Sequence, residues 1–248
     1  MPLRSLKQYI ESFSLSGINE LFTDSKEFKL NIKVNNHSPE FDSQIFPANN
    51  FNELTNNLID YKITDLNLLK KKYSHCKNCD FHHNRIKFVY GEGSSTADCL
   101  IISNPPDSDE NLTGRPFMGR NGQLFNKMIQ AVNINREEIY LTNICKCRPD
   151  KNFNPQILNK CLDYLNQQIY VIKPKIILIF GSIAANCFLN LNYEMEQLRI
   201  KNPFSFDKIP VFVTYHPESL HNNNNLKKLA WLDLQKFRDS YQNLRKEV

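Results

Sequence analysis

The sequence predicts an α/β protein, a three-layer α/β/α sandwich in which helices cover both faces of a central four-stranded parallel sheet. Two observations predict this fold. Four short apolar runs after residue 97 have the length of buried strands, and a helical apolar pattern follows each of them. Strand–helix alternation of this kind is typical of parallel sheets whose crossover helices pack on the two faces.

The expected strands and helices follow one another along the chain. The strands are 99–103, 139–144, 175–180 and 211–214, and the helices are 122–132, 155–172, 182–189 and 226–244. Upstream, apolar spacing predicts helices over 3–21 and 54–73, with a polar linker rich in Asn and Ser over 23–47. We therefore expect a helical extension with its linker over 1–72 and an α/β domain over 73–248.

Composition excludes several classes of protein. The 248 residues carry 31 basic and 26 acidic side chains, a net charge of +5, and 11% are aromatic, which excludes a highly charged disordered chain. The best apolar run, Ile176–Phe180, is far shorter than the roughly 20 residues of a membrane-spanning helix. The charged start and the odd count of seven cysteines also differ from a secreted disulfide scaffold. We expect a cytoplasmic protein.

The segments with the most chemistry lie where the expected strands end. SNPPDSDE follows the first strand, TNICKCRP crosses the end of the second, and YHPESL follows the fourth. In open parallel sheets, ligands bind outside the carboxyl ends of the strands. We therefore expect these three segments to meet at one edge of the sheet.

Four cysteines suggest a metal centre. Cys76 and Cys79 form a CxxC, which alone could be a redox pair, half of a metal site or chance, and Cys147 and Cys161 follow later. Four thiolates suit either a tetrahedral zinc site or an iron–sulfur cluster. The alternative is that Cys161, on the apolar face of a helix, is a core residue.

The order CxxC, GRPFMGRNGQLF, LTNICKCRP, Cys and TYHPESL resembles the family 4 uracil-DNA glycosylases, the iron–sulfur members of their superfamily. The resemblance covers about residues 73 to 240, and its two longest motifs are far more specific than a CxxC. It implies a [4Fe–4S] cluster held by Cys76, Cys79, Cys147 and Cys161, with zinc as the alternative. It also implies a DNA repair enzyme that acts on uracil-containing DNA.

The resemblance assigns roles at the base pocket. A glycosylase flips its target nucleotide into a pocket and reads the edge of the base. Phe117 would stack on uracil, Asn143 would read it by hydrogen bonds, and His216 would stabilise the negative charge on O2 as the bond breaks. Ser103 and Pro105 would lie against the same base. The alternatives are a core phenylalanine and a capping asparagine.

The resemblance also predicts the contacts with DNA. Arg120 and Arg148 would bind phosphates, Ser219 would press on the backbone, and Leu220 would be an apolar wedge that offsets the unstacking of the flipped base. We expect a monomer associated with the nucleoid, with the extension over 1–72 available to a protein partner.

One motif departs from the family. Where the family carries GEAPG, this chain has SNPPD, so Asn104 replaces the catalytic glutamate and Ser103 and Asp107 replace glycines. An asparagine can orient a water molecule but cannot take its proton. Asp107, Asp109 and Glu110 lie in the same loop and could compensate. The retained Asn143 and His216 favour a glycosylase, whereas the altered motif favours a catalytically silent DNA-binding homologue, and a zinc-stabilised nucleic-acid-binding module is a third hypothesis.

Overall fold

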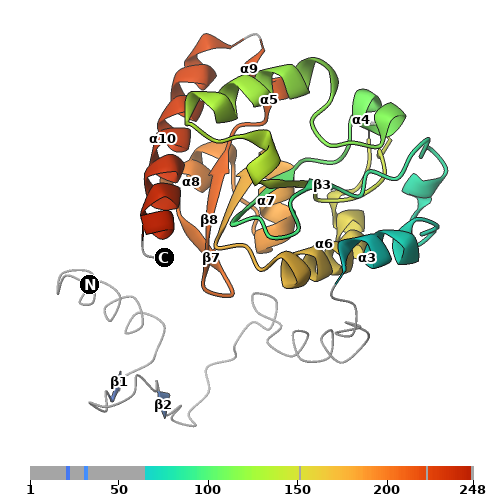
Figure 1. Ribbon diagram of the computed structural model, residues 1–248, viewed down its shortest axis with the longest axis horizontal. Helices are drawn as coiled ribbons and strands as arrows, with labels where there is room; N and C mark the ends of the chain where they lie inside the picture. Colours follow the sequence, from blue (N-terminus) through green and yellow to red (C-terminus); the bar gives the residue numbers. More distant parts are fainter. Residues whose placement is uncertain (1–20, 23–30, 33–64, 151, 222, 247–248) are drawn as a thin grey trace, which may run out of the picture. The chain divides into compact units, whose positions relative to one another are not determined.

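The computed structural model describes residues 21–22, 31–32, 65–150, 152–221 and 223–246. The α/β unit is built on one six-stranded sheet of order β3-β5-β4-β6-β8-β7 (Figure 1). The strands are β3 (Glu92–Gly93), β4 (Cys99–Ser103), β5 (Tyr140–Asn143), β6 (Ile176–Phe180), β7 (Phe204–Phe206) and β8 (Ile209–Thr214).

The four predicted strands are confirmed, and they pair in parallel as the central β5, β4, β6 and β8. The prediction of a four-stranded sheet was incomplete, because β3 and β7 pair antiparallel at its two edges. Each edge strand has only two or three residues, and none of them is fully buried. Such short, half-exposed segments leave no periodic apolar signal in a sequence.

Helices cover both faces of the sheet, as predicted. Alternate strand residues point to opposite faces. Ile101 and Leu178 pack with residues of α5 (Gly119–Ala131) and α10 (Asn224–Lys246). Their neighbours in the strands face the other layer, where α6 (Asn159–Ile172) and α7 (Ser182–Leu189) lie. The α/β/α sandwich is therefore confirmed (Figure 1).

Several short elements connect these layers and were not predicted. The expected helix over 155–172 begins as a 3₁₀ turn before α6, and the expected helix over 54–73 is described only from Leu66 onward. Helices of three to six residues span too few turns for a period to be recognised. The elements that were not predicted are α4 (Ser108–Thr113), α8 (Met195–Ile200), α9 (Pro217–Leu220), η1 (Asp80–His82) and η2 (Arg136–Glu138). In contrast, α3 (Leu66–Tyr73) and η3 (Pro155–Leu158) lie within the helices expected over 54–73 and 155–172.

The chain divides into two compact units, 1–57 and 58–248. In the first, β1 (Leu21–Phe22) pairs antiparallel with β2 (Asn31–Ile32), and the rest of the expected helix over 3–21 and linker over 23–47 lies outside the described residues. In the second, Tyr73 Oη of α3 donates a hydrogen bond of 2.7 Å to Gln167 of α6. The structure therefore joins α3 to the α/β unit, earlier than the expected division at 72/73.

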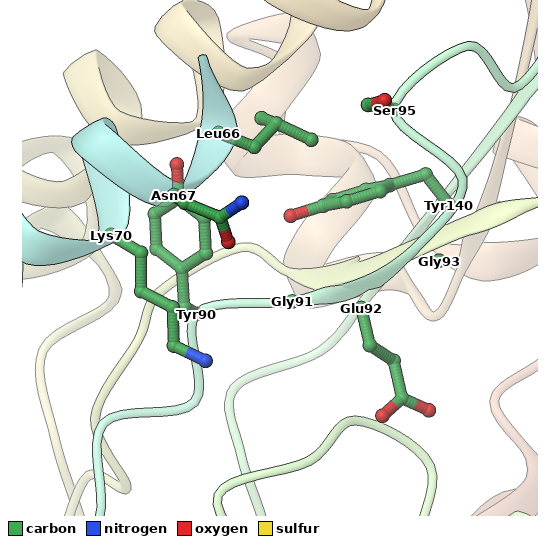
Figure 2. A pocket seen from close by; sticks show the side chains of 9 residues that line it. All are labelled: Leu66, Asn67, Lys70, Tyr90, Gly91, Glu92, Gly93, Ser95 and Tyr140. Carbon is green, nitrogen blue, oxygen red and sulfur yellow. The ribbon is translucent and has the colours of Figure 1, made fainter.

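A cavity of about 340 Å³ lies between α3 and the β3 edge of the sheet (Figure 2). The side chains of Leu66, Tyr90 and Tyr140 border it, while the Glu92 carboxylate points away from the two tyrosines. Among the helices that the structure describes, none is long and apolar enough to cross a membrane.

Candidate active site and cysteine cluster

The three predicted segments meet at the carboxyl edge of the sheet. Ser103, the last residue of β4, is in register with Asn143 at the end of β5 and with Phe180 at the end of β6. Phe180 is in turn in register with Thr214, two residues before His216. Ser103 and Asn143 are fully buried and His216 is 8% exposed. Parallel pairing thus brings together side chains that are separated by up to 113 residues in the sequence.

His216 is a neutral hydrogen-bond donor. It caps α9, where its Nδ1 accepts a hydrogen bond of 3.3 Å from the backbone N–H of Glu218. Burial lowers the pKa of His216 to about 4. Because a neutral imidazole carries one proton and Nδ1 is the acceptor, the proton resides on Nε2. Nε2 lies 3.2 Å from Ser103 Oγ, to which it donates.

Asn143 presents an unpaired acceptor. Its Nδ2 donates to the backbone carbonyl of Asn104 at 2.9 Å and to Glu110 Oε1 at 3.2 Å, which uses both of its hydrogens. Its Oδ1 is buried and has no partner among the residues that the structure describes. An unpaired buried acceptor costs about 1–3 kcal/mol, so this position favours a ligand with an N–H group.

Glu110 connects three segments of the site by hydrogen bonds. Its carboxylate accepts from Asn143, from the Phe117 N–H at 2.6 Å and from the Asp107 N–H at 2.8 Å. Burial raises the pKa of Glu110 to about 7. Asp107 completes a capping box on α4 by accepting from the Glu110 N–H. Glu110 was expected only as a spare charge in the loop, although the Asp-x-x-Glu pattern is a sequence signal for such a box.

Phe117 is held in a strained position. Its φ angle is +51°, in the left-handed region, and its side chain is 3% exposed. The ring stacks on Phe125 with a centroid distance of 3.8 Å, meets Phe180 edge-on at 5.6 Å, and lies 6.3 Å from the His216 ring. A Cβ at Gly122 would come within 1.9 Å of the Phe117 carbonyl oxygen, so only glycine fits beneath the loop.

Arg136 clamps the same loop and was not predicted from the sequence. Its guanidinium donates to the carbonyls of Pro116 at 2.7 Å and Phe117 at 3.4 Å, and to Asn126 Oδ1 at 2.8 Å. Glu92 accepts from it at 2.7 Å. Arg136 also borders a cavity of about 350 Å³ on which the Phe117 loop lies. No spacing in the sequence connects these residues, because two of the partners are backbone carbonyls.

Asn104 faces helix α7. Its Oδ1 accepts a hydrogen bond of 3.1 Å from the Ala184 N–H in the first turn of that helix. The side chain packs on Gly181, where a Cβ would lie 2.4 Å from Oδ1. Pro105 follows it and is half-buried. Asn104 Nδ2 has no partner among the described residues, and it is the donor by which this side chain can orient a water molecule.

The residues expected to contact DNA differ in exposure. Arg120 and Ser219 are exposed and Arg148 is half-buried. Leu220 does not meet the expectation of a wedge, because it is 1% exposed and packs with Tyr215 and Ala230. It is the last residue of the short α9, and this end of the helix turns the side chain toward α10.

The four predicted cysteine ligands are free thiols, three of them buried and Cys76 half-buried. The Cys161 thiol donates a hydrogen bond to Cys79 and thereby lowers the pKa of Cys79 to about 6. Tyr164 Oη donates to Cys76 Sγ at 2.8 Å, and Arg85 donates to Cys147 Sγ at 3.5 Å. These donors suit sulfur atoms that carry negative charge, so the chemistry of the set fits an iron–sulfur cluster. In the described part of the chain, no three His, Cys, Asp or Glu side chains form a ready metal-binding group.

Lys146 connects the cysteines with the pocket. It is fully buried, and burial lowers its pKa to about 7. Its Nζ donates to the Asn143 carbonyl at 2.9 Å and to Gln168 Oε1 at 2.8 Å. The backbone that carries Asn143 is thus fixed by a residue next to Cys147.

Comparison with known proteins agrees with this geometry. The model of the uracil DNA glycosylase superfamily matches residues 90–235, more than half of the chain. The chain belongs to the uracil DNA glycosylase superfamily. The chain is 32% identical over 172 residues to the Type-4 uracil-DNA glycosylase of Archaeoglobus fulgidus. The aligned residues cover 65% of this chain and 86% of that relative. The chain is 30% identical over 177 residues to the Type-4 uracil-DNA glycosylase of Thermotoga maritima, with 69% and 92% covered.

Within this superfamily fold, the matched region contains all the pocket side chains described above and two of the four cysteines, Cys147 and Cys161. Cys76 and Cys79 precede it. The resemblance seen in the sequence is therefore confirmed at the level of the family, and the roles of individual residues are proposals.

Proposed function

We propose that the protein is a uracil-DNA glycosylase, which hydrolyses the N-glycosidic bond of deoxyuridine in DNA, releases uracil and leaves an abasic site. One observation carries this proposal. His216 Nε2–H and the unpaired Asn143 Oδ1 lie at one edge of the sheet, and the Phe117 ring lies 6.3 Å from the His216 ring. Relatives similar to this chain over most of their length carry the name of that activity.

The open acceptor of Asn143 favours uracil over cytosine. Uracil has an N–H at position 3, next to the O2 carbonyl, whereas cytosine has a lone pair at N3. A uracil flipped against Phe117 donates its N3–H to Asn143 Oδ1, which has no other partner among the described residues. Cytosine would place its N3 lone pair against the same oxygen, and an unsatisfied polar pair of this kind costs about 1–3 kcal/mol. Glu110 maintains the discrimination because it holds the amide in this orientation.

The reaction depends on stabilising the leaving group. As the C1′–N1 bond breaks, its electron pair moves onto uracil and is delocalised to O2. His216 donates its Nε2–H to this oxygen while remaining neutral. Water then bonds to C1′ of the oxocarbenium-like sugar and loses a proton, and the uracil anion takes up a proton. Asn104 orients this water through Nδ2, a weaker aid than the glutamate of the family.

The cysteines form the second part of the proposal. Cys76, Cys79, Cys147 and Cys161 would hold a [4Fe–4S] cluster, which supplies a structural link between the segment before β3, the end of β5 and α6. Purified protein should then be yellow-brown with broad absorption near about 400 nm and about four irons per chain. Cys147→Ser should bleach it, whereas Cys187→Ser, a half-buried cysteine outside the set, should not. A colourless protein with one zinc per chain would contradict the cluster.

The altered first motif supports one rival, a DNA-binding homologue without activity. In this structure Asn104 is engaged by α7 and Ser103 by His216. Single-turnover incubation of a uracil-containing oligonucleotide, followed by alkali and a gel, separates the two functions. We expect slow cleavage by the wild type, a loss of about 10²–10³ in His216→Ala, and no change in His83→Ala, an exposed histidine. Absence of wild-type cleavage with retained DNA binding would leave the silent homologue.

A further inference from the structure

The hydroxyl of Ser103 is the polar group nearest to the catalytic histidine. Ser103 is 0% exposed at the end of β4, and its Oγ lies 3.2 Å from His216 Nε2. The family's motif has glycine at this position, so the hydroxyl is an addition of this chain. Its position is fixed by the sheet, since the Ser103 backbone is in register with both Asn143 and Phe180.

The direction of that hydrogen bond follows from the other histidine nitrogen. Because the Glu218 N–H donates to Nδ1, Nε2 carries the proton and Ser103 Oγ is the acceptor. The hydroxyl therefore still has its own hydrogen, and no second partner of Ser103 Oγ exists among the described residues. A fully buried O–H whose hydrogen has no acceptor favours a ligand that supplies one.

Uracil O2 supplies that acceptor. A carbonyl oxygen accepts two hydrogen bonds, and two donors about 3 Å apart can share one such oxygen, as in oxyanion holes. On entry of the base, rotation about the Cβ–Oγ bond brings the hydroxyl hydrogen to O2, and the Nε2–H, whose direction is fixed by the ring, is shared between Oγ and O2 as a bifurcated hydrogen bond. Neither side chain has to leave its place, because only the hydroxyl hydrogen of Ser103 moves.

We propose that Ser103 is a second catalytic donor, which together with His216 stabilises the negative charge on O2 of the departing uracil. This inference rests on the proposed glycosylase function and deepens it. The second donor offsets part of what is lost with the glutamate of the first motif. The pocket then selects bases that have a 2-oxo group beside an N3–H, which Asn143 reads.

Ser103→Ala tests the proposal, because it removes only the hydroxyl from a buried position and should leave the fold intact. We expect single-turnover excision of uracil to fall by about 10²-fold, the lower end for loss of one oxyanion donor. Affinity for a duplex carrying an abasic-site analogue should not change, since that ligand lacks the base. Ser205→Ala, an exposed serine of β7, is the matched control.

A second substrate distinguishes a catalytic role from a structural one. 5-Fluorouracil leaves more readily as an anion than uracil does, so the defect of Ser103→Ala should shrink on a 5-fluorouracil oligonucleotide. A defect of equal size on both substrates would overturn the proposal. So would an unchanged rate, or a faster one, which would mean that the hydroxyl only sequesters His216. Wild-type protein that cleaves neither substrate would refute the glycosylase function and this inference together, whereas active wild type with unaffected Ser103→Ala refutes the inference alone.

Discussion

Arg136→Met should both destabilise the protein and slow base excision, because one guanidinium holds the loop that carries Phe117. The substitution removes the hydrogen bonds to the Pro116 carbonyl and Asn126 Oδ1, at 2.7 and 2.8 Å. Bonds to a charged group contribute about 1.5–3 kcal/mol. Since the Arg136 side chain is 23% exposed, we count these two at the low end, about 3 kcal/mol together, and neglect the screened ion pair with Glu92.

A loss of about 3 kcal/mol corresponds to a fall in Tm of roughly 6–12 °C for a domain of this size. Excision should slow by about tenfold or more, because the left-handed backbone of Phe117 is itself strained by about 1–3 kcal/mol and relaxes without its clamp. Thermal unfolding followed by circular dichroism and single-turnover cleavage measure the two effects. Arg245→Met, which removes an exposed ion pair with Glu138, is the matched control.

The order of effects decides whether Arg136 acts through Phe117. In a double-mutant cycle, Arg136→Met should slow excision much less in a Phe117→Ala background than in the wild type. Fully additive effects, or a variant that melts and cleaves like the wild type, would refute the reasoning.

Three further predictions concern Asn104, the pH dependence of stability and the contacts with DNA. Asn104→Ala should slow excision by at most about 10²-fold and by less than His216→Ala, while Asn104→Glu should speed it; the reverse order in single-turnover assays would show that water activation limits the rate. Burial lowers the pKa of His216 from 6.5 to about 4, so the stability that depends on its neutral form is lost as pH falls through that window. Burial raises the pKa of Glu110 from 4.5 to about 7, so the stability that depends on its protonated form is lost as pH rises through that window. Glu110→Gln should therefore gain stability relative to the wild type as pH rises from about 4.5 to about 6.5, by roughly 2–3 kcal/mol in urea denaturation, and parallel pH profiles would contradict this. Arg120→Ala or Arg148→Ala should flatten the slope of log K against log salt by about 0.9 if the residue neutralises one phosphate; unchanged slopes for both would place the DNA on another surface.

The sequence predicted those parts of the fold that repeat over many residues. The apolar runs of β4 and β6 are continuous, and α10 has enough turns for its period to be recognised, so each was located within a few residues. The edge strands and the helices of four to six residues, α4, α8 and α9, carry no such signal. Their positions are set by pairing with neighbours that only the folded sheet provides.

The sequence likewise predicted only part of the pocket. Because ligands bind at the carboxyl ends of parallel strands, the sequence pattern alone indicates that Asn143 and His216 share one edge of the sheet. The sequence did not predict the residues that support the pocket. Arg136 binds backbone carbonyls, and Glu110 binds backbone N–H groups as well as Asn143, so no sequence spacing marks them. Leu220 shows the opposite error, since an apolar residue in a functional motif was expected at the surface and proved to be in the core.

The register that joins Ser103, Asn143 and Thr214 has a consequence for cutting the chain in two. A break in the connection between α7 and α8 would leave the base-reading groups on one fragment and His216 on the other. Neither fragment alone would contain a complete pocket, since the parallel pairing of β6 with β8 is what aligns them. Excision by a mixture of the two fragments would therefore require that β8 pair again with β6.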